Sequence, residues 1–375
     1  MIRFNKPYIT GRELEYIKDV VKNGRLAGNG KFTKLCQQFF ERKYGFKKTL
    51  LTTSCTDAME MAAILLDIKA GDEVIAPSYT FVSTANAFVL RGAKIVFADC
   101  EPNFPNISAN EIEKLITEKT KAIVLVHYGG VACEMSSISS IVKNHDLYLV
   151  EDAAQSINSF YNGEPLGSFG DLSAFSFHET KNIVSGEGGM IAINNPKFIE
   201  RAEVVWEKGT NRSAFFRGEV EKYNWMDIGS SFLPSEINAA FLFAQLEALE
   251  KIEKKRKTIW NYYQEQLLPL KNSGHIEIPE IPDHKTNNAH LFYLLTKNLN
   301  ERNRLLEFLK ENEINAVFHY LSLHASPYYQ KFRDNREFPN SMNFEERLIR
   351  LPLYPDLKSE EMAHIVRSVF KFYEK

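Results

Sequence analysis

A lysine in a glycine-hinged loop is the first residue of this sequence whose surroundings suggest covalent chemistry. Lys181 follows the apolar run 172–177 and precedes the glycine-rich run 186–189, after which a second apolar run covers 190–193. Glycines allow positive φ and close approach of the backbone to a ligand. A lysine placed in this way can lose water and lower its pKa, which a Schiff-base amine requires. The alternative is an ordinary surface lysine, since Lys and Arg together number 46.

Two other stretches place polar groups at the ends of apolar strands. The run 147–150 leads into an acidic pair that ends in Asp152, and residues that contact ligands in open α/β sheets sit at the carboxyl ends of strands. The run 48–52 is followed by Cys55, Thr56 and a helical pattern, and the free N–H groups of a helix N-terminus bind phosphate. The chain therefore offers a phosphate site, a strand-end carboxylate and a loop lysine. By itself, Asp152 could equally be a helix N-cap.

Alternating strand and helix patterns predict the fold that positions these groups. Apolar runs typical of strands lie near 48–52, 73–76, 93–98, 121–127, 147–150, 172–176 and 190–193. Helical patterns lie between them near 56–67, 80–91, 109–117, 135–145 and 196–207. This alternation predicts an α/β fold with a mostly parallel sheet and helices on both faces.

Helical patterns also flank this core. Thr10 and Glu13 have the spacing of a capping box, which predicts a helix over 10–22. Helical periodicity returns over 32–44, and one long helix or two are expected over 235–268.

The pattern changes beyond Pro269. Short strand-like pieces and two helices are expected there, near 275–278, 289–296, 315–319, 301–312 and 359–374. We therefore expect a large domain over 1–250 and a smaller α+β C-terminal domain over 251–375, with the N-terminal arm 1–12 packing near the small domain.

Residues 209–232 have no clear periodicity yet are rich in aromatic side chains. A long irregular stretch inside a compact domain is usually functional or disordered, and the aromatic content favours order. The alternative is an ordinary surface loop.

Composition excludes several classes of function. The net charge is −2, which argues against nucleic acid as the main partner. No apolar run approaches 18 residues and the first residues do not form a signal peptide, so we expect no membrane association. The four cysteines are widely spaced and show no metal-ligand spacing. We expect free thiols in the cytoplasm and no metal site.

Five blocks carry a resemblance to a known family. They are 52–56 (TTSCT), 77–84 (PSYTFVST), 151–155 (EDAAQ), 175–182 (FSFHETKN) and 186–189 (GEGG). Together they resemble the DegT/DnrJ/EryC1/StrS family of sugar aminotransferases, and the resemblance covers essentially the whole chain. It implies the aspartate-aminotransferase-like fold, called fold type I, with a seven-stranded sheet in the large domain. It also implies pyridoxal 5′-phosphate (PLP), alternating with pyridoxamine phosphate (PMP), as cofactor.

The resemblance implies a role for each cofactor residue. Lys181 should form the Schiff base and then act as general base and acid, while Asp152 should pair with the pyridinium nitrogen. Gln155 should hydrogen-bond the ring hydroxyl, and Phe81, in preference to Tyr79, should stack on the ring. The phosphate should be held by Cys55, Thr56 and Ser176, and by Ser231, which stands where relatives carry an asparagine that reaches in from the neighbouring subunit.

Other blocks suggest the substrates. The blocks 92–97, 127–135, 207–213, 227–231 and 317–320 look most like the branch of the family that makes dTDP-4-amino-4,6-dideoxy-D-galactose for bacterial glycans such as the lipopolysaccharide O-antigen and enterobacterial common antigen. This implies L-glutamate as donor, 2-oxoglutarate as its product, and dTDP-4-keto-6-deoxy-D-glucose as acceptor, aminated at C4. It also implies a homodimer with composite sites. The expected substrate contacts are Lys208, Arg212, His319 and Tyr320.

Several alternatives stay open. Within the family these are a 3-keto-sugar, a GDP-linked sugar, or the C4 epimer 4-amino-4,6-dideoxyglucose. The dehydratase branch of the same fold carries histidine in place of the lysine, and Lys181 argues against it. A cofactor-binding regulator would need a DNA-binding module, for which we expect no room.

Overall fold

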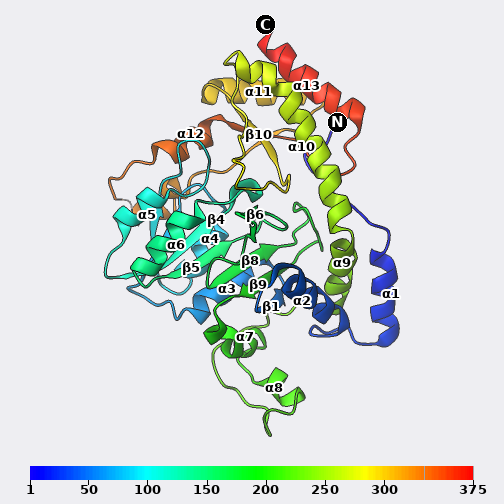
Figure 1. Ribbon diagram of the computed structural model, residues 1–375, viewed down its shortest axis with the longest axis vertical. Coiled ribbons are helices and arrows are strands. Elements are labelled where there is room, and N and C mark those ends of the chain that lie inside the picture. The colour runs from blue at the N-terminus through cyan, green and yellow to red at the C-terminus, as the bar shows by residue number, and fades with distance from the viewer. Residues whose placement is uncertain (333, 375) are drawn as a thin grey trace.

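A seven-stranded sheet forms the centre of the molecule. Its strands are β1 (Lys48–Thr52), β2 (Glu73–Pro77), β3 (Lys94–Ala98), β4 (Thr120–Val126), β5 (Tyr148–Asp152), β8 (Leu172–Ser176) and β9 (Gly189–Ile193). In the computed structural model (Figure 1), which describes residues 1–332 and 334–374, their order is β1-β9-β8-β5-β4-β2-β3. Among these described strands, β9 runs antiparallel to both of its neighbours, β1 and β8, and all other neighbouring pairs are parallel. The predicted α/β fold and mostly parallel sheet are confirmed.

Helices cover both faces of the sheet because successive strand residues point to opposite sides. One face is covered by α3 (Cys55–Leu65), α4 (Ser83–Val89) and α7 (Ile199–Trp206), and the other by α2 (Lys31–Tyr44), α5 (Ala109–Leu115), α6 (Met135–Asn144) and α9 (Glu236–Glu247). On β4, Val124 packs with α3 and α4, while Ile123 and Leu125 pack with α5 and α6. On β1, Leu50 packs on the face covered by α3 and α7, whereas Leu51 packs on the face covered by α2 and α9.

The first helix begins later than the sequence predicted. α1 covers Glu13–Asn23, because Gly11 has a φ of +101° that a helix cannot accommodate. The expected capping side chain is nevertheless present, since Glu13 accepts hydrogen bonds from the backbone N–H groups of Thr10 and Gly11 at 2.7 and 2.9 Å. Only the Glu13 half of the predicted capping box is therefore present, and Thr10 is not the N-cap, since that position belongs to Arg12, which forms no side-chain capping bond.

The C-terminal region contains one strand that the sequence did not reveal. Its three-stranded antiparallel sheet has the order β10-β12-β11, formed by β10 (Phe292–Leu295), β12 (Leu348–Leu351) and β11 (Val317–Phe318). The helices packed around it are α10 (Leu249–Asn272), α11 (Leu299–Glu311), α12 (Pro339–Arg347) and α13 (Ser359–Tyr373). The sequence analysis predicted neither β12 nor α12. The four residues of β12 include one arginine and show no clear period.

Two C-terminal predictions need correction. The run 275–278 is not a strand, and only Glu277 pairs with Leu295 in an isolated bridge. α10 continues past Pro269 to Asn272, since a proline in the last turn removes only one hydrogen bond from the helix. Within the described residues, no helix is long and apolar enough to cross a bilayer.

The division of the chain at residue 250 stays a prediction. α9 and α10 meet at Ala248, and Figure 1 shows them as one nearly continuous column beside the sheet. A second apolar core lies beneath α10, α11 and α13. The residues before α1 run along this part of the molecule: Ile2 is buried and forms a parallel bridge with Ile314.

The aperiodic segment 209–232 extends away from the sheet at the end of the molecule opposite α13 (Figure 1). It contains one short helix, α8 (Arg212–Phe216). Most of its apolar side chains are exposed, with Trp225 at 83% and Phe216 at 71% of their full accessible surface, whereas Phe232 at its end is buried.

Glu151, which precedes Asp152 at the end of β5, is held by buried hydrogen bonds. Glu151 is fully buried and accepts hydrogen bonds from the N–H groups of Gly167 at 2.8 Å and Gly170 at 2.6 Å. It is also 2.9 Å from Nε2 of His127, whose Nδ1 accepts from the backbone N–H of Cys133, so Nε2 carries the proton and donates. Glu151 therefore ties the end of β5 to the loop before β8.

We predict that Glu151→Gln lowers the free energy of unfolding by about 2–4 kcal/mol, because an amide leaves one buried N–H facing another donor. The shift of the urea unfolding midpoint measures this effect. Glu164→Gln, on the exposed β7 (Glu164–Pro165), is the matched control and should change the midpoint little. Equal midpoints for both variants would contradict the anchoring role.

Candidate active site

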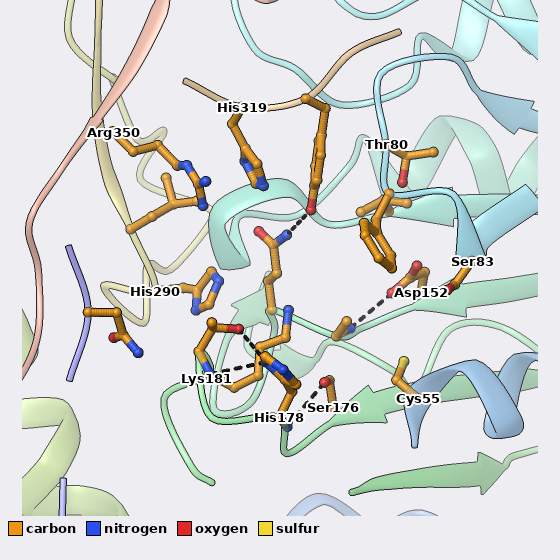
Figure 2. Close-up of a pocket in the computed structure, with 18 of the residues that line it drawn as sticks. Cys55, Thr80, Ser83, Asp152, Ser176, His178, Lys181, His290, His319 and Arg350 are labelled. Atoms are coloured by element: carbon orange, nitrogen blue, oxygen red, sulfur yellow. Dashed lines mark hydrogen bonds between the residues drawn. The ribbon is translucent and has the colours of Figure 1, made fainter. Parts of the chain in front are cut away.

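A cavity of about 760 Å³ opens at the carboxyl ends of β2, β4, β5 and β8. Figure 2 shows Ser176 and Cys55 on one side of it and Arg350 and His319 on the other. The structure brings most of the residues nominated from the sequence into this one cavity: Cys55, Thr56, Phe81, Asp152, Gln155, Ser176, Lys181, His319 and Tyr320.

The first turn of α3 forms one end of the cavity. Ser54 is its N-cap and accepts from the N–H of Asp57 at 3.0 Å, and Thr56 Oγ1 lies 2.8 Å from Ser83 Oγ. Gly189 of β9 packs directly against this turn, since a Cβ there would lie 2.2 to 2.4 Å from backbone atoms of Ser54 and Cys55. The other first-turn N–H groups have no intrahelical partner, so the turn can bind an anion.

Lys181 lies on a loop that extends the β8–β9 pair. Phe177 N–H donates to Gly188 O at 2.8 Å, Glu179 N–H donates to Gly186 O at 2.9 Å, and Gly186 turns with a φ of +81°. Burial lowers the pKa of Lys181, and nearby Arg350 lowers it further, whereas Cys55 and Asp152 act in the opposite direction. The predicted desolvated lysine on a glycine-hinged loop is thus what the structure contains.

Asp152 is buried at the end of β5. Thr84 Oγ1 donates to its Oδ2 at 2.7 Å, and the N–H of Ala154 donates to Oδ1 at 3.1 Å. Burial raises the pKa of Asp152, and these two hydrogen bonds together with the charge of Lys181 only partly oppose the rise. A cationic group next to Asp152 would restore the ionised form.

A wall of aromatic and amide side chains lines the cavity above these groups. Gln155 Nε2 donates to the Tyr320 hydroxyl at 3.1 Å, and Gln155 Oε1 accepts from the N–H of Gly129 at 2.7 Å. His319 Nδ1 lies 2.9 Å from the Tyr128 hydroxyl, and burial keeps the pKa of His319 well below its usual value. The neutral form of His319 is therefore favoured, and this form can both donate and accept a hydrogen bond.

Phe81 and Tyr79 differ in accessibility. Phe81 lines the cavity with 57% of its surface exposed, whereas Tyr79 is buried and donates its hydroxyl proton to His319 O. Only the Phe81 ring is free to stack on a ligand, in line with the preference from the sequence.

Among the lining residues that were not nominated from the sequence, three carry groups that could contact a ligand. Arg350 of β12 has a buried Nε without a hydrogen-bond partner among the described residues, and its Nη2 donates only to Phe318 O at 3.3 Å. Burial lowers the pKa of Arg350, but a guanidinium stays protonated near neutrality. The other two are His290, 3.0 Å from Asn182 Oδ1, and Phe4 of the N-terminal arm. No local pattern marks them, because the fold alone brings them to the cavity.

Three nominated residues lie outside the cavity. Lys208, Arg212 and Ser231 belong to the projecting segment or adjoin it, and all three are exposed. Arg212 lies 3.9 Å from Glu207 in a separate surface pocket. Within one chain, these residues and the cavity do not meet.

The cavity fits the cofactor that the sequence resemblance implies. The α3 turn suits a phosphate, the buried carboxylate of Asp152 suits a protonated ring nitrogen, and Lys181 suits an aldehyde. Each group would satisfy a charge or donor that the protein alone leaves uncompensated.

Comparison with known proteins agrees with this geometry. The family model described as the DegT/DnrJ/EryC1/StrS aminotransferase family matches residues 7–370. A GDP-perosamine synthase from Vibrio cholerae is 30% identical, with 100% of this chain and 99% of that protein covered.

Two solved structures share the fold closely. The aminotransferase TlmJ from Streptoalloteichus hindustanus has a TM-score of 0.92 at 26% identity, covering 100% of this chain and 99% of that one. The PMP form of Spr1654 from Streptococcus pneumoniae has a TM-score of 0.92 at 25% identity, covering 100% and 99%. A PLP form of Spr1654 also matches. The chain therefore belongs to the DegT/DnrJ/EryC1/StrS aminotransferase family, and its cofactor is PLP in exchange with PMP.

Proposed function

We propose that this protein transfers the amino group of L-glutamate to C4 of a nucleotide-linked 4-keto-6-deoxy-hexose. The preferred acceptor is dTDP-4-keto-6-deoxy-D-glucose, and the product is dTDP-4-amino-4,6-dideoxy-D-galactose. The observation that carries the transfer chemistry is the placement of the half-buried Lys181 and the buried Asp152 in one cavity beside a helix N-terminus. The choice of sugar rests on the sequence blocks 207–213 and 317–320.

Lys181 and Asp152 divide the proton chemistry. When bound, the cofactor supplies an electron sink and carries the amino group between the two substrates. Lys181 Nζ would hold it covalently and, once released, take the proton from the donor Cα. Burial favours this role, since a lowered pKa gives a larger fraction of neutral amine near neutral pH. Asp152 Oδ1 and Oδ2 would hold the proton on the ring nitrogen.

Cys55 contributes position without thiol chemistry. Burial and the charge of Asp152 hold the pKa of Cys55 well above its usual value, so the thiol stays protonated. Its backbone N–H, with the hydroxyls of Thr56 and Ser176, is the proposed phosphate contact.

Arg350 is our choice for the donor carboxylate. Its guanidinium forms no ion pair with a described carboxylate, and it is near enough to Lys181 to depress the pKa of that amine. The α-carboxylate of an amino acid is bonded to the same carbon as its amine. An amine that replaces Lys181 Nζ therefore brings its α-carboxylate within a few bond lengths of the lysine, on the side where Arg350 lies.

The acceptor side would be completed by a second copy of the chain. The exposed apolar surface on 209–232 supports a homodimer, and the same segment carries Arg212 and Ser231, with Lys208 next to it. The diphosphate lies farther from the reacting carbon than the donor carboxylate, because the hexose ring separates them. Cations delivered from a partner suit that position, and Arg212 can bind phosphate oxygens bidentately. His319 and Tyr320 would contact the sugar.

The alternative acceptors are a GDP-linked sugar, a 3-keto-sugar and the C4 epimer. The name of the Vibrio cholerae relative favours the GDP-linked sugar among them. Incubation of the purified protein with glutamate and each keto-sugar nucleotide, followed by NMR of the product, distinguishes all four. A product aminated at C3, or turnover of the GDP-sugar alone, would overturn the preferred acceptor.

We also propose that the protein works in the cytoplasm. Three of its four cysteines are buried, and all four are free in the described structure. Free thiols suit a reducing compartment.

We predict that Lys181→Ala abolishes transfer from glutamate, because no other described amine occupies the cavity floor. Borohydride treatment of the wild-type holoenzyme, followed by peptide mass spectrometry, should place the cofactor on Lys181. Lys197→Ala, at an exposed lysine, is the control and should keep full activity. Turnover by Lys181→Ala would disprove the assignment.

We predict that Asp152→Asn folds normally but loses about a hundredfold or more in kcat, since a neutral amide cannot stabilise a protonated ring nitrogen. Its urea midpoint should stay near that of the wild type, in contrast to Glu151→Gln one residue earlier. Near-normal turnover in Asp152→Asn would show that another group is the ring partner.

We predict that mixing two defective variants restores activity. If Arg212 serves the partner's site, a heterodimer of Lys181→Ala and Arg212→Ala contains one site with both residues intact. Random reassociation of equal amounts should then recover about a quarter of the wild-type activity. The readout is turnover at a sugar concentration where Arg212→Ala alone is nearly silent. No recovery, with exchange of subunits verified by mass spectrometry, would place Arg212 elsewhere.

A further inference from the structure

The N-terminal arm crosses the mouth of the cavity between two anchors. At one end, Ile2 N–H donates to Glu313 O at 2.7 Å, and Asn315 N–H donates to Ile2 O at 3.0 Å. At the other end, Tyr8 O accepts from Gln245 Nε2 of α9 at 2.8 Å. The residues between these anchors are therefore held in place by both parts of the molecule.

Two residues of this stretch reach into the cavity. The ring of Phe4 lies against the guanidinium of Arg350, with Cζ 4.7 Å from the ring centre. Asn5 Nδ2 donates to Glu179 O at 3.0 Å, on the loop that carries Lys181. The arm thus contacts both the free cation and the lysine loop.

We propose that Phe4 is a positioning residue for the amino donor: it covers one face of the Arg350 guanidinium and leaves its edge to bind a carboxylate of the donor. This inference rests on the proposed function. The N–H groups of a guanidinium lie in its plane, so a ring on its face leaves them free. Arg350 Nε has no hydrogen-bond partner among the described residues, and Nη2 donates only to Phe318 O at 3.3 Å, so the guanidinium keeps donor capacity for a planar anion.

The aromatic ring has a second effect on the cation. It attracts the guanidinium and replaces water on that face, so the side chain is held ready without a competing carboxylate. An acidic partner would hold Arg350 equally well but would occupy the edge that the substrate needs. Phe4 therefore orders Arg350 at no cost to its binding capacity.

The test compares three single variants of the PLP-loaded enzyme. Phe4→Leu keeps apolar bulk but removes the aromatic face, Phe4→Tyr restores it, and Lys6→Ala changes an exposed residue of the same arm. The probe is glutarate, which is glutamate without its amine, and its Kd is measured by calorimetry. KM and kcat are then measured separately for glutamate and for the keto-sugar nucleotide.

Phe4→Leu should raise the Kd of glutarate and the KM of glutamate by between about 3-fold and about 30-fold, as expected for loss of a cation–π contact. The KM of the nucleotide-sugar and the melting temperature should stay near wild type, and Phe4→Tyr and Lys6→Ala should match wild type throughout. Unchanged glutarate and glutamate binding in Phe4→Leu, or a defect confined to the sugar, overturns the inference while the proposed function stands. A wild-type enzyme that takes no amino group from glutamate fails the proposed function, and the inference with it.

Discussion

The loss of water around Lys181 and Asp152, which line one cavity, is the constraint on which the rest of the site depends. Burial disfavours the charged form of each group, lowering the pKa of the lysine and raising that of the aspartate. The protein offsets only part of this cost, with two hydrogen bonds to Asp152. The pair is therefore fully compensated only when a ligand brings a cation to the carboxylate and a carbonyl to the amine.

The sheet fixes these groups by its direction and its pleat. β5 and β8 are parallel, so their carboxyl ends deliver Asp152 and the Lys181 loop to one edge. Neighbouring residues of a strand point to opposite faces of the sheet. Glu151 can therefore anchor the loop before β8, while Asp152 beside it faces the cavity. The antiparallel β9 then returns along β8 and brings Gly189 against the first turn of α3. A side chain at residue 189 would separate the phosphate end of the cavity from its lysine end.

Local sequence patterns predicted the site residues that the large sheet positions, but they missed the site residue that comes from the C-terminal region. Apolar runs located all seven strands of the large sheet, and strand ends located Asp152, Cys55 and Lys181. Arg350 was missed because β12 is short and its partners are distant in sequence. Phe4 was missed because an irregular arm has no periodicity, and its meaning comes from a ring contact across the fold. The start of α1 was misplaced because Gly11 takes a positive φ that no spacing rule detects.

The large sheet and the C-terminal strand β12 contribute different charged groups to the site. The large sheet supplies the carboxylate and the amine that we propose act on the cofactor, whereas β12 adds Arg350, a cation that this proposal does not need to hold the ring. A cation left free in a buried place costs free energy unless an anion completes it. Every proposed substrate is an anion, either a dicarboxylate or a nucleotide diphosphate. Arg350 lines the same cavity as Lys181, whereas Arg212 lies outside that cavity on the projecting segment. Distance from the lysine would therefore sort the anions, with the donor carboxylate held within one chain and the diphosphate held by its partner.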